Sequence, residues 1–350
     1  MQLMKRIYFH TIYPELNESN RLFATDSAPI GDDLLVPFTE LRDYALLRGL
    51  EVQTAESNLP EDADAVVLLD LPQKLTAFHR AAMTSSIPLY LIALESKIIA
   101  ASSHDPQLHS YFQRIFTWDD HIVDGKKYIK INYSFKRATS TQDDDWKNRK
   151  LCTLISSNKF SSHPDELYSA RLQLIEWFEK NHPEQFKLYG MGWDRHHFFE
   201  NRYLRQINKI PMLRGIFRSG RPSYVGRVNS KKDVLQNYKF AIAYENAAGH
   251  AGYITEKIFD CMFAGCIPIY HGAPNIRDYI PRDCFIDRKD FISNEALYYH
   301  LINMSDSEIL IRRENIKNFL MSDAFSPFST DVFASTVIDK ISEQLWPNLY

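Results

Sequence analysis

The chain is poor in the residues that mark several common classes of protein. Its 350 residues contain four cysteines, and its formal net charge at pH 7 is -3. Because it carries no excess of positive charge, we expect no nucleic-acid partner. The cysteines follow no CxxC or metal-ligand spacing, which predicts buried free thiols and suits a reducing cytoplasm. They are Cys152, Cys261, Cys266 and Cys284.

Long apolar runs are also missing. No segment approaches the length that spans a bilayer, and the start, MQLMKRIYFHTIY, lacks the apolar core of a secretory signal. We therefore expect a cytoplasmic protein with no transmembrane segment and at most peripheral contact with a membrane surface.

The clusters that could bind a metal ion are weak. Asp143, Asp144 and Asp145 lie in a hydrophilic segment, where a solvated run of charges is the better interpretation. His196 and His197 are adjacent, and neighbouring rings cannot easily bind one metal ion together. The sequence has no convincing D-x-D site, and we predict no metal site.

The first half of the chain does contain a regular alternation of strands and helices. Pro37–Leu47 and Pro72–Met83 have helical patterns, and residues 13–33 form a long polar loop. This alternation predicts an α/β domain with a parallel sheet and helices on both faces. The apolar runs of strand length lie at residues 6–10, 51–54, 65–70, 89–94, 114–118 and 128–131.

The second half repeats the pattern after a polar segment, Thr139–Lys150, which we interpret as a linker. A chain of this length is more often two domains than one. We predict an N-terminal domain over residues 1–145 and a C-terminal domain over residues 146–335. Residues 336–350 are the end of a last amphipathic helix and tail, which we expect to cross back onto the N-terminal domain.

One stretch of the second half has the pattern of a βαβ unit. Phe240–Tyr244 reads as a strand, and Thr255 is a candidate N-cap for a short apolar helix that Gly265 ends. Cys266–Tyr270 reads as the next buried strand. In open α/β sheets, ligands bind in the crevice at the carboxyl ends of such strands.

Three polar residues lie at the start of this short helix, where free N–H groups suit a phosphate. Lys257 could hold a pyrophosphate, Glu256 could accept the two hydroxyls of a ribose, and the Tyr253 ring could pack on a base or sugar. Each residue alone is more often structural. Their presence together at one crevice favours a ligand site.

Glu95 ends the apolar strand PLYLIALE at a carboxyl edge. A carboxylate at the rim of an apolar cleft can have a raised pKa and act as a general base. The alternative is a rim acid that caps the next helix. From its position alone, Glu95 is equally well interpreted as a general base or as a rim acid that caps the helix.

The segment YENAAGHAGYITEKIFDCMFAGCIPIYHGAPNIRDYIP resembles the signature region of glycosyltransferase family 10, the α-1,3/1,4-fucosyltransferases, and YITEK is its most specific part. The resemblance is firm over residues 238–291 and rests on the order of elements elsewhere. It implies an α/β fold of the GT-B type, in which two Rossmann-like domains face a cleft. The missing anchor and stem make the chain similar to bacterial, cytosol-facing members.

The resemblance also implies roles for single residues. Glu95 matches the position of the family's proposed catalytic base. Arg171, in YSARLQLIEWF, matches an arginine that contacts the donor pyrophosphate, although without the resemblance an ordinary exposed helix arginine is preferred. Lys257 would join it at the pyrophosphate.

Four further residues complete the donor site that the resemblance implies. Glu245 and Asn246 would lie near the sugar or phosphate, and Tyr253 and Glu256 nearer the nucleoside. The loop AAGHAG differs among relatives in length and composition, so the contacts of Asn246 follow less directly.

The activity that the resemblance implies is inverting transfer of L-fucose from GDP-fucose to a glycan hydroxyl, O3 of GlcNAc or Glc, with no metal or cofactor. The acceptor would belong to a bacterial surface glycan, such as lipopolysaccharide O-antigen or an N-acetyllactosamine-like unit, and the protein would work at the inner face of the membrane. Two alternatives stay open, namely another GDP-sugar donor and a non-catalytic protein that binds a sugar nucleotide.

Overall fold

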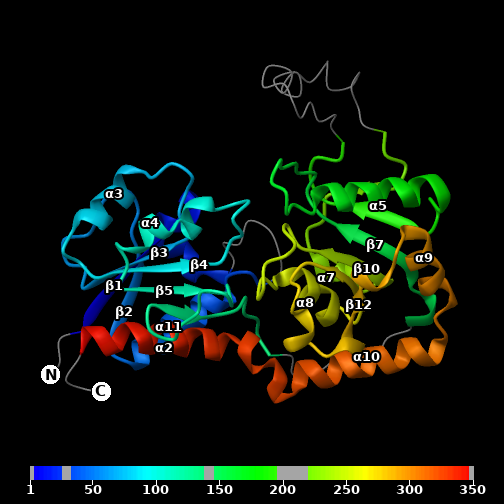
Figure 1. Ribbon diagram of the computed structural model, residues 1–350. Coiled ribbons are helices and arrows are strands. Elements are labelled where there is room, and N and C mark those ends of the chain that lie inside the picture. The colour runs from blue at the N-terminus through cyan, green and yellow to red at the C-terminus, as the bar shows by residue number, and fades with distance from the viewer. Residues whose placement is uncertain (1–3, 26–32, 138–145, 195–219, 347–350) are drawn as a thin grey trace, which may run out of the picture.

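A computed structural model describes residues 4–25, 33–137, 146–194 and 220–346. It has two lobes that lie side by side, with helices α10 and α11 running along the lower edge of both (Figure 1). Most of the expected linker, with Asp143, Asp144 and Asp145, falls outside the described ranges, as do His196 and His197.

Each lobe is built on one parallel sheet of six strands. The first sheet has the order β2-β1-β3-β4-β5-β6. Every residue of β3 and β4 is buried, which is why these strands read as continuous apolar runs and not as alternating ones. The strands are β1 Lys5–Thr11, β2 Leu50–Thr54, β3 Ala65–Leu69, β4 Leu89–Ala93, β5 Arg114–Thr117 and β6 Tyr128–Lys130.

The second sheet has the order β12-β11-β10-β7-β8-β9, which is the strand order of a Rossmann fold. The chain changes direction between β7 and β10 in this sheet and between β1 and β3 in the first. Ligands bind at such switch points, outside the carboxyl ends of the strands. The strands are β7 Lys150–Ile155, β8 Phe186–Tyr189, β9 Tyr224–Gly226, β10 Tyr238–Tyr244, β11 Ile267–His271 and β12 Ile286–Asp287.

Helices cover the sheets as the alternating pattern predicted. Helix α8 is followed by Gly265 with φ +63°, a left-handed conformation that glycine adopts without strain, as expected for the residue that ends this helix. The helices are α1 Pro14–Asn17, α2 Val36–Leu47, α3 Ala77–Thr84, α4 Pro106–His109, α5 Tyr168–Asn181, α7 Lys231–Leu235, α8 Glu256–Phe263, α9 Asn294–Asn303, α10 Asp306–Met321 and α11 Thr330–Leu345.

Two expectations for the N-terminal domain are wrong. Part of the polar loop expected at residues 13–33 folds into α1 and a 3-10 helix, Glu18–Phe23, because Leu22 and Phe23 are buried and Phe23 packs edge-on against Phe9 at 5.5 Å. The helix expected from Pro72 begins only at Ala77.

The last helix belongs to the N-terminal core. Phe333, Val337 and Ile341 of α11 join the apolar cluster that lies under β1 and β3, and α11 packs along α2 (Figure 1). The expected domain boundary after residue 335 falls inside this continuous helix, whose first turns already lie in the N-terminal core.

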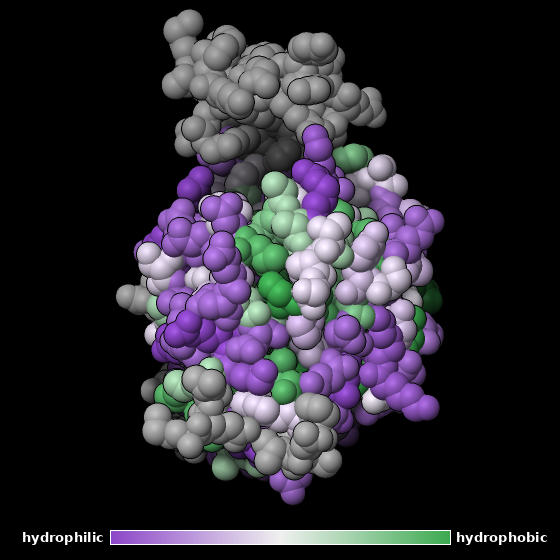
Figure 2. Space-filling model, turned by 90° about the vertical axis from the view of Figure 1, so that its left-hand side faces the viewer, coloured by the Kyte–Doolittle hydropathy of each residue, from purple (hydrophilic) through white to green (hydrophobic). Residues whose placement is uncertain are grey.

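All four cysteines are buried and unpaired, as their spacing predicted. Within the described ranges, no helix is both long and apolar enough to cross a membrane. On the face of the first lobe that points away from the second, an apolar strip lies between hydrophilic residues (Figure 2).

The two domains are joined by a polar network around Asp120. Its carboxylate accepts hydrogen bonds from Lys130 at 2.6 Å and, across the interface, from Tyr279 at 2.6 Å and Asn275 at 2.9 Å. The Asn275 amide oxygen in turn accepts the N–H of Gly252 at 2.9 Å. Through these bonds the N-terminal domain holds the loop that precedes Tyr253.

We expect Asp120→Ala to lower the free energy of unfolding by about 2 kcal/mol, because three partners lose a charged acceptor. Urea midpoints of the variant and the wild type would measure the loss. Asp124→Ala is the matched control, since this exposed carboxylate accepts backbone N–H groups within its own turn. Equal urea midpoints for the Asp120 and Asp124 variants would contradict the role of the interdomain network.

Candidate active site

The candidate site lies where the carboxyl ends of the two sheets meet. Tyr13 and Asp70 follow β1 and β3, the two strands at the first switch point, and Glu95 follows the neighbouring β4. In the second sheet, Glu245 follows β10, and Lys257 lies in the first turn of α8. Each domain therefore contributes charged residues from its ligand-binding edge.

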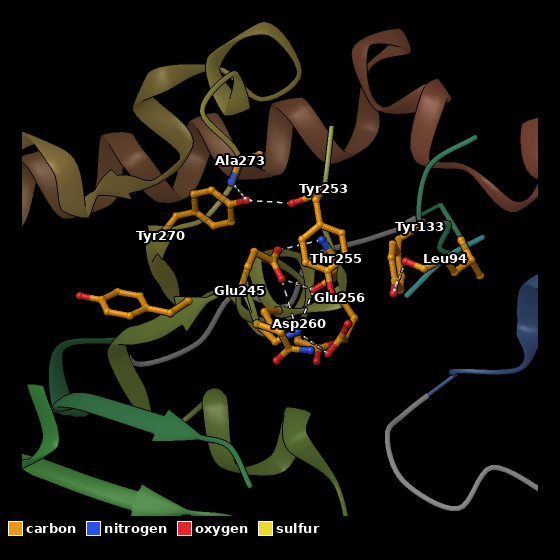
Figure 3. A network of polar contacts seen from close by, with 12 residues as sticks. Leu94, Tyr133, Glu245, Tyr253, Thr255, Glu256, Asp260, Tyr270 and Ala273 are labelled. Atoms are coloured by element: carbon orange, nitrogen blue, oxygen red, sulfur yellow. Dashed lines mark hydrogen bonds and ion pairs between the residues drawn. The ribbon is translucent and has the colours of Figure 1, made fainter. Parts of the chain in front are cut away.

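A compact hydrogen-bonded network surrounds the start of α8 (Figure 3). The carboxylate of Glu245 is fully buried and accepts the N–H of Thr255 at 2.8 Å and its hydroxyl at 2.6 Å. The Lys257 ammonium donates to the Thr255 hydroxyl at 2.9 Å, and it lies 3.3 Å from a Glu256 oxygen and 3.4 Å from a Glu245 oxygen. Two carboxylates thus fix one ammonium group.

The charges of this network stabilise one another. Burial alone would lower the pKa of Lys257, but Glu256 and Glu245 more than offset it, so the pKa is raised and the ammonium stays charged. Burial would likewise raise the pKa of Glu256, yet Lys257 and Lys231 hold it at about 2. Glu245 differs, since burial raises its pKa against the opposing effect of Lys257.

The expected N-cap is partly wrong. Thr255 occupies the N-cap position of α8, but its hydroxyl donates to Glu245 instead of capping the helix. The first N–H groups of an α-helix have no partner within the helix, and they carry the positive end of its dipole. An anion is a suitable partner for them.

Arg171 is not the exposed helix arginine that the residues alone suggested. It is 4% exposed, and its Nη2 group donates to the carbonyls of Tyr244 and Glu245, both at 2.6 Å, and to the Asn246 side chain at 3.1 Å. The structure brings Arg171 and Asn246 together at the end of β10. Their contact with a donor stays a prediction.

Tyr253 lies at the interface between the domains. Its side chain is 1% exposed, and its ring packs against Trp118 of the N-terminal domain at a centroid distance of 4.8 Å. Gly252 is required beside it, because a Cβ there would lie 2.2 Å from the Trp118 carbonyl oxygen. The ring expected to pack on a base or sugar is thus covered by protein in this conformation.

Glu95 faces the C-terminal domain from the end of β4. Burial raises its pKa, Lys257 opposes that rise, and Glu256 adds to it, so the two edges interact through space. The Tyr13 hydroxyl donates to its carboxylate at 3.2 Å. A half-buried carboxylate with a raised pKa opposite a fixed cation has the properties of a general base.

Sequence reasoning missed Tyr13 and Asp70. Asp70 is 2% exposed, has φ +58°, and burial together with the nearby Glu95 raises its pKa to about 8. The sequence pattern placed Asp70 inside the apolar run of residues 65–70, whereas β3 ends at Leu69. The sequence signal that could have identified it is the one that marks Glu95, an acid directly after a buried strand.

The raised pKa makes stability depend on pH. The folded protein keeps the proton of Asp70 up to about pH 8, whereas the unfolded chain releases it near the ordinary value of about 3.9. The stabilising contribution is therefore complete below about pH 3.9 and is lost progressively as the pH rises to about 8. We expect Asp70→Asn to lose less stability than the wild type between pH 5 and pH 9, measured as urea midpoints. Parallel curves for the two proteins would contradict this.

The fold and the site together define a GT-B glycosyltransferase architecture. A crystal structure of α1,3-fucosyltransferase with GDP-fucose superposes with a TM-score of 0.54 at 15% identity, over 98% of this chain and 90% of that one. Anabaena Alr3699/HepE in complex with UDP-glucose gives a TM-score of 0.55 at 12% identity, over 97% and 99%. At these identities the superpositions establish the fold alone.

Residues 147–313 match the family model for "Glycosyltransferase family 10 (fucosyltransferase) C-term". The predicted resemblance is confirmed over these residues, which make up just under half of the chain. An Alpha-(1,4)-fucosyltransferase of Arabidopsis thaliana is 36% identical over 75 residues, 21% of this chain and 18% of that protein. Alpha-(1,3)-fucosyltransferase FucT of Helicobacter pylori is 42% identical over 74 residues, 21% and 15%. The matched stretches span less than a fifth of these curated relatives.

Proposed function

We propose that this chain is an inverting fucosyltransferase that moves L-fucose from GDP-fucose to a glycan hydroxyl, O3 of GlcNAc or Glc. The observation that carries the proposal is the match of residues 147–313 to the family 10 fucosyltransferase model, together with Glu95 and Lys257 at the carboxyl ends of strands in the two sheets. The family 10 domain supports fucose as the sugar and GDP-fucose as its donor.

The reaction is a single displacement. The acceptor oxygen forms a bond to C1 of fucose on the face opposite to the diphosphate, and the C1–O bond to GDP breaks with its electron pair. Glu95 takes the proton of the acceptor hydroxyl as that bond forms. The configuration at C1 inverts because attack and departure occur on opposite faces.

The departing GDP carries negative charge that the C-terminal domain would stabilise. Lys257 supplies a fixed ammonium, and the first N–H groups of α8 supply the positive end of a helix dipole. The buried Nε of Arg171 has no hydrogen-bond partner within the described ranges, and a diphosphate oxygen would satisfy this donor. These groups balance the charge without a metal, and we propose that neither a metal nor a cofactor takes part.

Nucleotide sugars other than GDP-fucose should be tested as donors, because the same fold occurs in a protein that binds UDP-glucose. HepE with UDP-glucose superposes as well as the fucosyltransferase does, so the architecture by itself suits other nucleotide sugars. The family 10 domain favours fucose. A protein that binds a sugar nucleotide without turnover is the remaining alternative.

The acceptor and location are part of the same proposal. We place the reaction in the bacterial cytoplasm, at the inner face of the membrane, on a surface glycan such as lipopolysaccharide O-antigen or an N-acetyllactosamine-like unit. The support is the family domain together with a bacterial relative, the Helicobacter pylori enzyme.

The test is release of GDP from GDP-fucose, with and without lactose or N-acetyllactosamine, beside GDP-mannose and UDP-glucose. Turnover of GDP-fucose that rises with acceptor and survives a chelator supports the proposal. Preference for another donor would overturn the choice of sugar, and abolition by chelator would overturn the metal-free chemistry. Tight GDP binding without turnover of any donor, even to water, would favour the binding protein.

A further inference from the structure

Asp70 lies at the first switch point, in a left-handed turn directly after β3. One of its oxygens, Oδ1, accepts three hydrogen bonds of 3.2 Å, from the N–H groups of Leu94 and Glu95 and from the hydroxyl of Ser103. The Ser103 hydroxyl in turn accepts the N–H of Leu71 at 2.7 Å. The aspartate therefore ties the end of β3 to the segment that carries Glu95.

The carbonyl groups of the same segment are also held. The Leu94 oxygen accepts from the Trp118 indole at 2.8 Å and from the Tyr133 hydroxyl at 3.0 Å (Figure 3). The Glu95 oxygen is 2.8 Å from Nε2 of His104. Every backbone polar group of Leu94 and Glu95 thus has a partner outside the strand ladder, and Asp70 accounts for both N–H groups.

This arrangement matters because Glu95 lies just beyond β4, where the ladder no longer sets the backbone direction. Misplacement of a reacting group by about 1 Å can lower a rate about a hundredfold. A carboxylate on an unsupported turn would not keep one position relative to Lys257.

We propose that Asp70 is a positioning residue for the proposed base, holding the Leu94–Glu95 backbone so that the Glu95 carboxylate faces the C-terminal domain. The inference rests on the proposed role of Glu95 and names a residue that acts through it. Asp70 itself does not touch the substrate.

Asparagine and alanine variants of Asp70 separate its hydrogen bonds to the Leu94–Glu95 backbone from its charge. Asparagine keeps the oxygen that takes all three hydrogen bonds and tolerates a left-handed turn, whereas alanine loses the acceptor. We expect Asp70→Ala to lower kcat about a hundredfold with the KM for GDP-fucose and the affinity for GDP within about twofold, since both depend on the other domain. Asp70→Asn should recover most of kcat.

Asp64→Ala is the matched control. Asp64 directly precedes β3, as Asp70 follows it, and its carboxylate accepts the N–H of Arg6 at 2.9 Å from the neighbouring strand. The control removes an equivalent strand-end contact at the opposite edge of the sheet. We expect it to change stability without lowering kcat.

A second readout does not depend on the acceptor. Infrared difference spectra against Glu95→Gln would follow the titration of the Glu95 carboxylate. The charged and titratable groups that act on it include Lys257, Glu256, Lys159, Tyr13 and Asp70. In Asp70→Ala the titration midpoint of the Glu95 carboxylate should fall by about one pH unit or more, toward the value of an exposed glutamate, because the turn opens to water. In Asp70→Asn it should not move.

The outcomes are distinguishable. If Glu95→Gln keeps full turnover, the base lies elsewhere, and the proposed mechanism and this inference both fail. If Glu95→Gln is inactive while folded Asp70→Ala keeps wild-type kcat and an unmoved Glu95 midpoint, only the inference fails. Should Asp70→Ala not fold, a low kcat and a shifted midpoint in Asp70→Asn would contradict the proposal.

Discussion

Replacing Glu95 by glutamine is expected to lower turnover about a hundredfold or more, while GDP binds as tightly as before. Glutamine keeps the size of the side chain and the hydrogen bond from Tyr13, but it cannot take the acceptor proton. The affinity for GDP should not change, because the proposed nucleotide contacts lie on the other domain. GDP release under saturating donor, with calorimetric titration of GDP, measures both quantities.

The pH profile gives this prediction a second test. Because burial raises the pKa of Glu95, the wild-type rate should fall, as the pH drops, at a higher pH than an ordinary glutamate would cause. Glu95→Gln should lack this acid limb. Glu61→Gln, an exposed site in the same domain, serves as the control. Full activity in Glu95→Gln would place the base on another residue.

Removal of the Lys257 ammonium is expected to have the second large effect. Lys257→Ala should weaken GDP binding at least tenfold and lower turnover further, because a charge-assisted contact to the diphosphate strengthens as GDP leaves. Titration with GDP and steady-state kinetics with GDP-fucose measure the two parts. Lys74→Ala, an exposed lysine of the N-terminal domain, is the control.

One structural effect has to be separated from this result. Lys257 also balances Glu245 and Glu256, so its loss leaves uncompensated carboxylates at the start of α8. The double variant Lys257→Ala, Glu256→Gln removes one negative charge with the positive one and should recover part of the stability, but not of the GDP affinity. GDP affinity within twofold of the wild type in both variants would show that Lys257 does not bind the diphosphate.

Much of the fold could be predicted because strand and helix patterns are local. The βαβ unit from β10 to β11, the buried runs of β3 and β4, and the glycine that ends α8 all appear in the order of residues. The predictions failed where no local pattern was present. Leu22 and Phe23 lie in a polar segment too short to show periodicity, and only their packing on β1 reveals them as core.

The candidate site could be predicted only in part. The residues of YITEK are neighbours in the chain, and the structure does place Glu256 and Lys257 together with Glu245. The partners of Arg171 could not be predicted, because they lie 73 to 75 residues away along the chain. The partner of Tyr253 could not be predicted either, because Trp118 belongs to the other domain. Burial changes what such residues can do, and no local pattern shows it.

The sequence by itself determined the α/β class, the resemblance of the C-terminal domain to glycosyltransferase family 10, and the acids and cations available at the strand ends. Only the tertiary structure decided which of them meet. It brought Asp70 to the backbone of Glu95, Glu245 beneath Lys257, and Trp118 against Tyr253. The physical reason is that parallel strands separated along the chain end at one edge of a sheet, and two such edges face each other here (Figure 1).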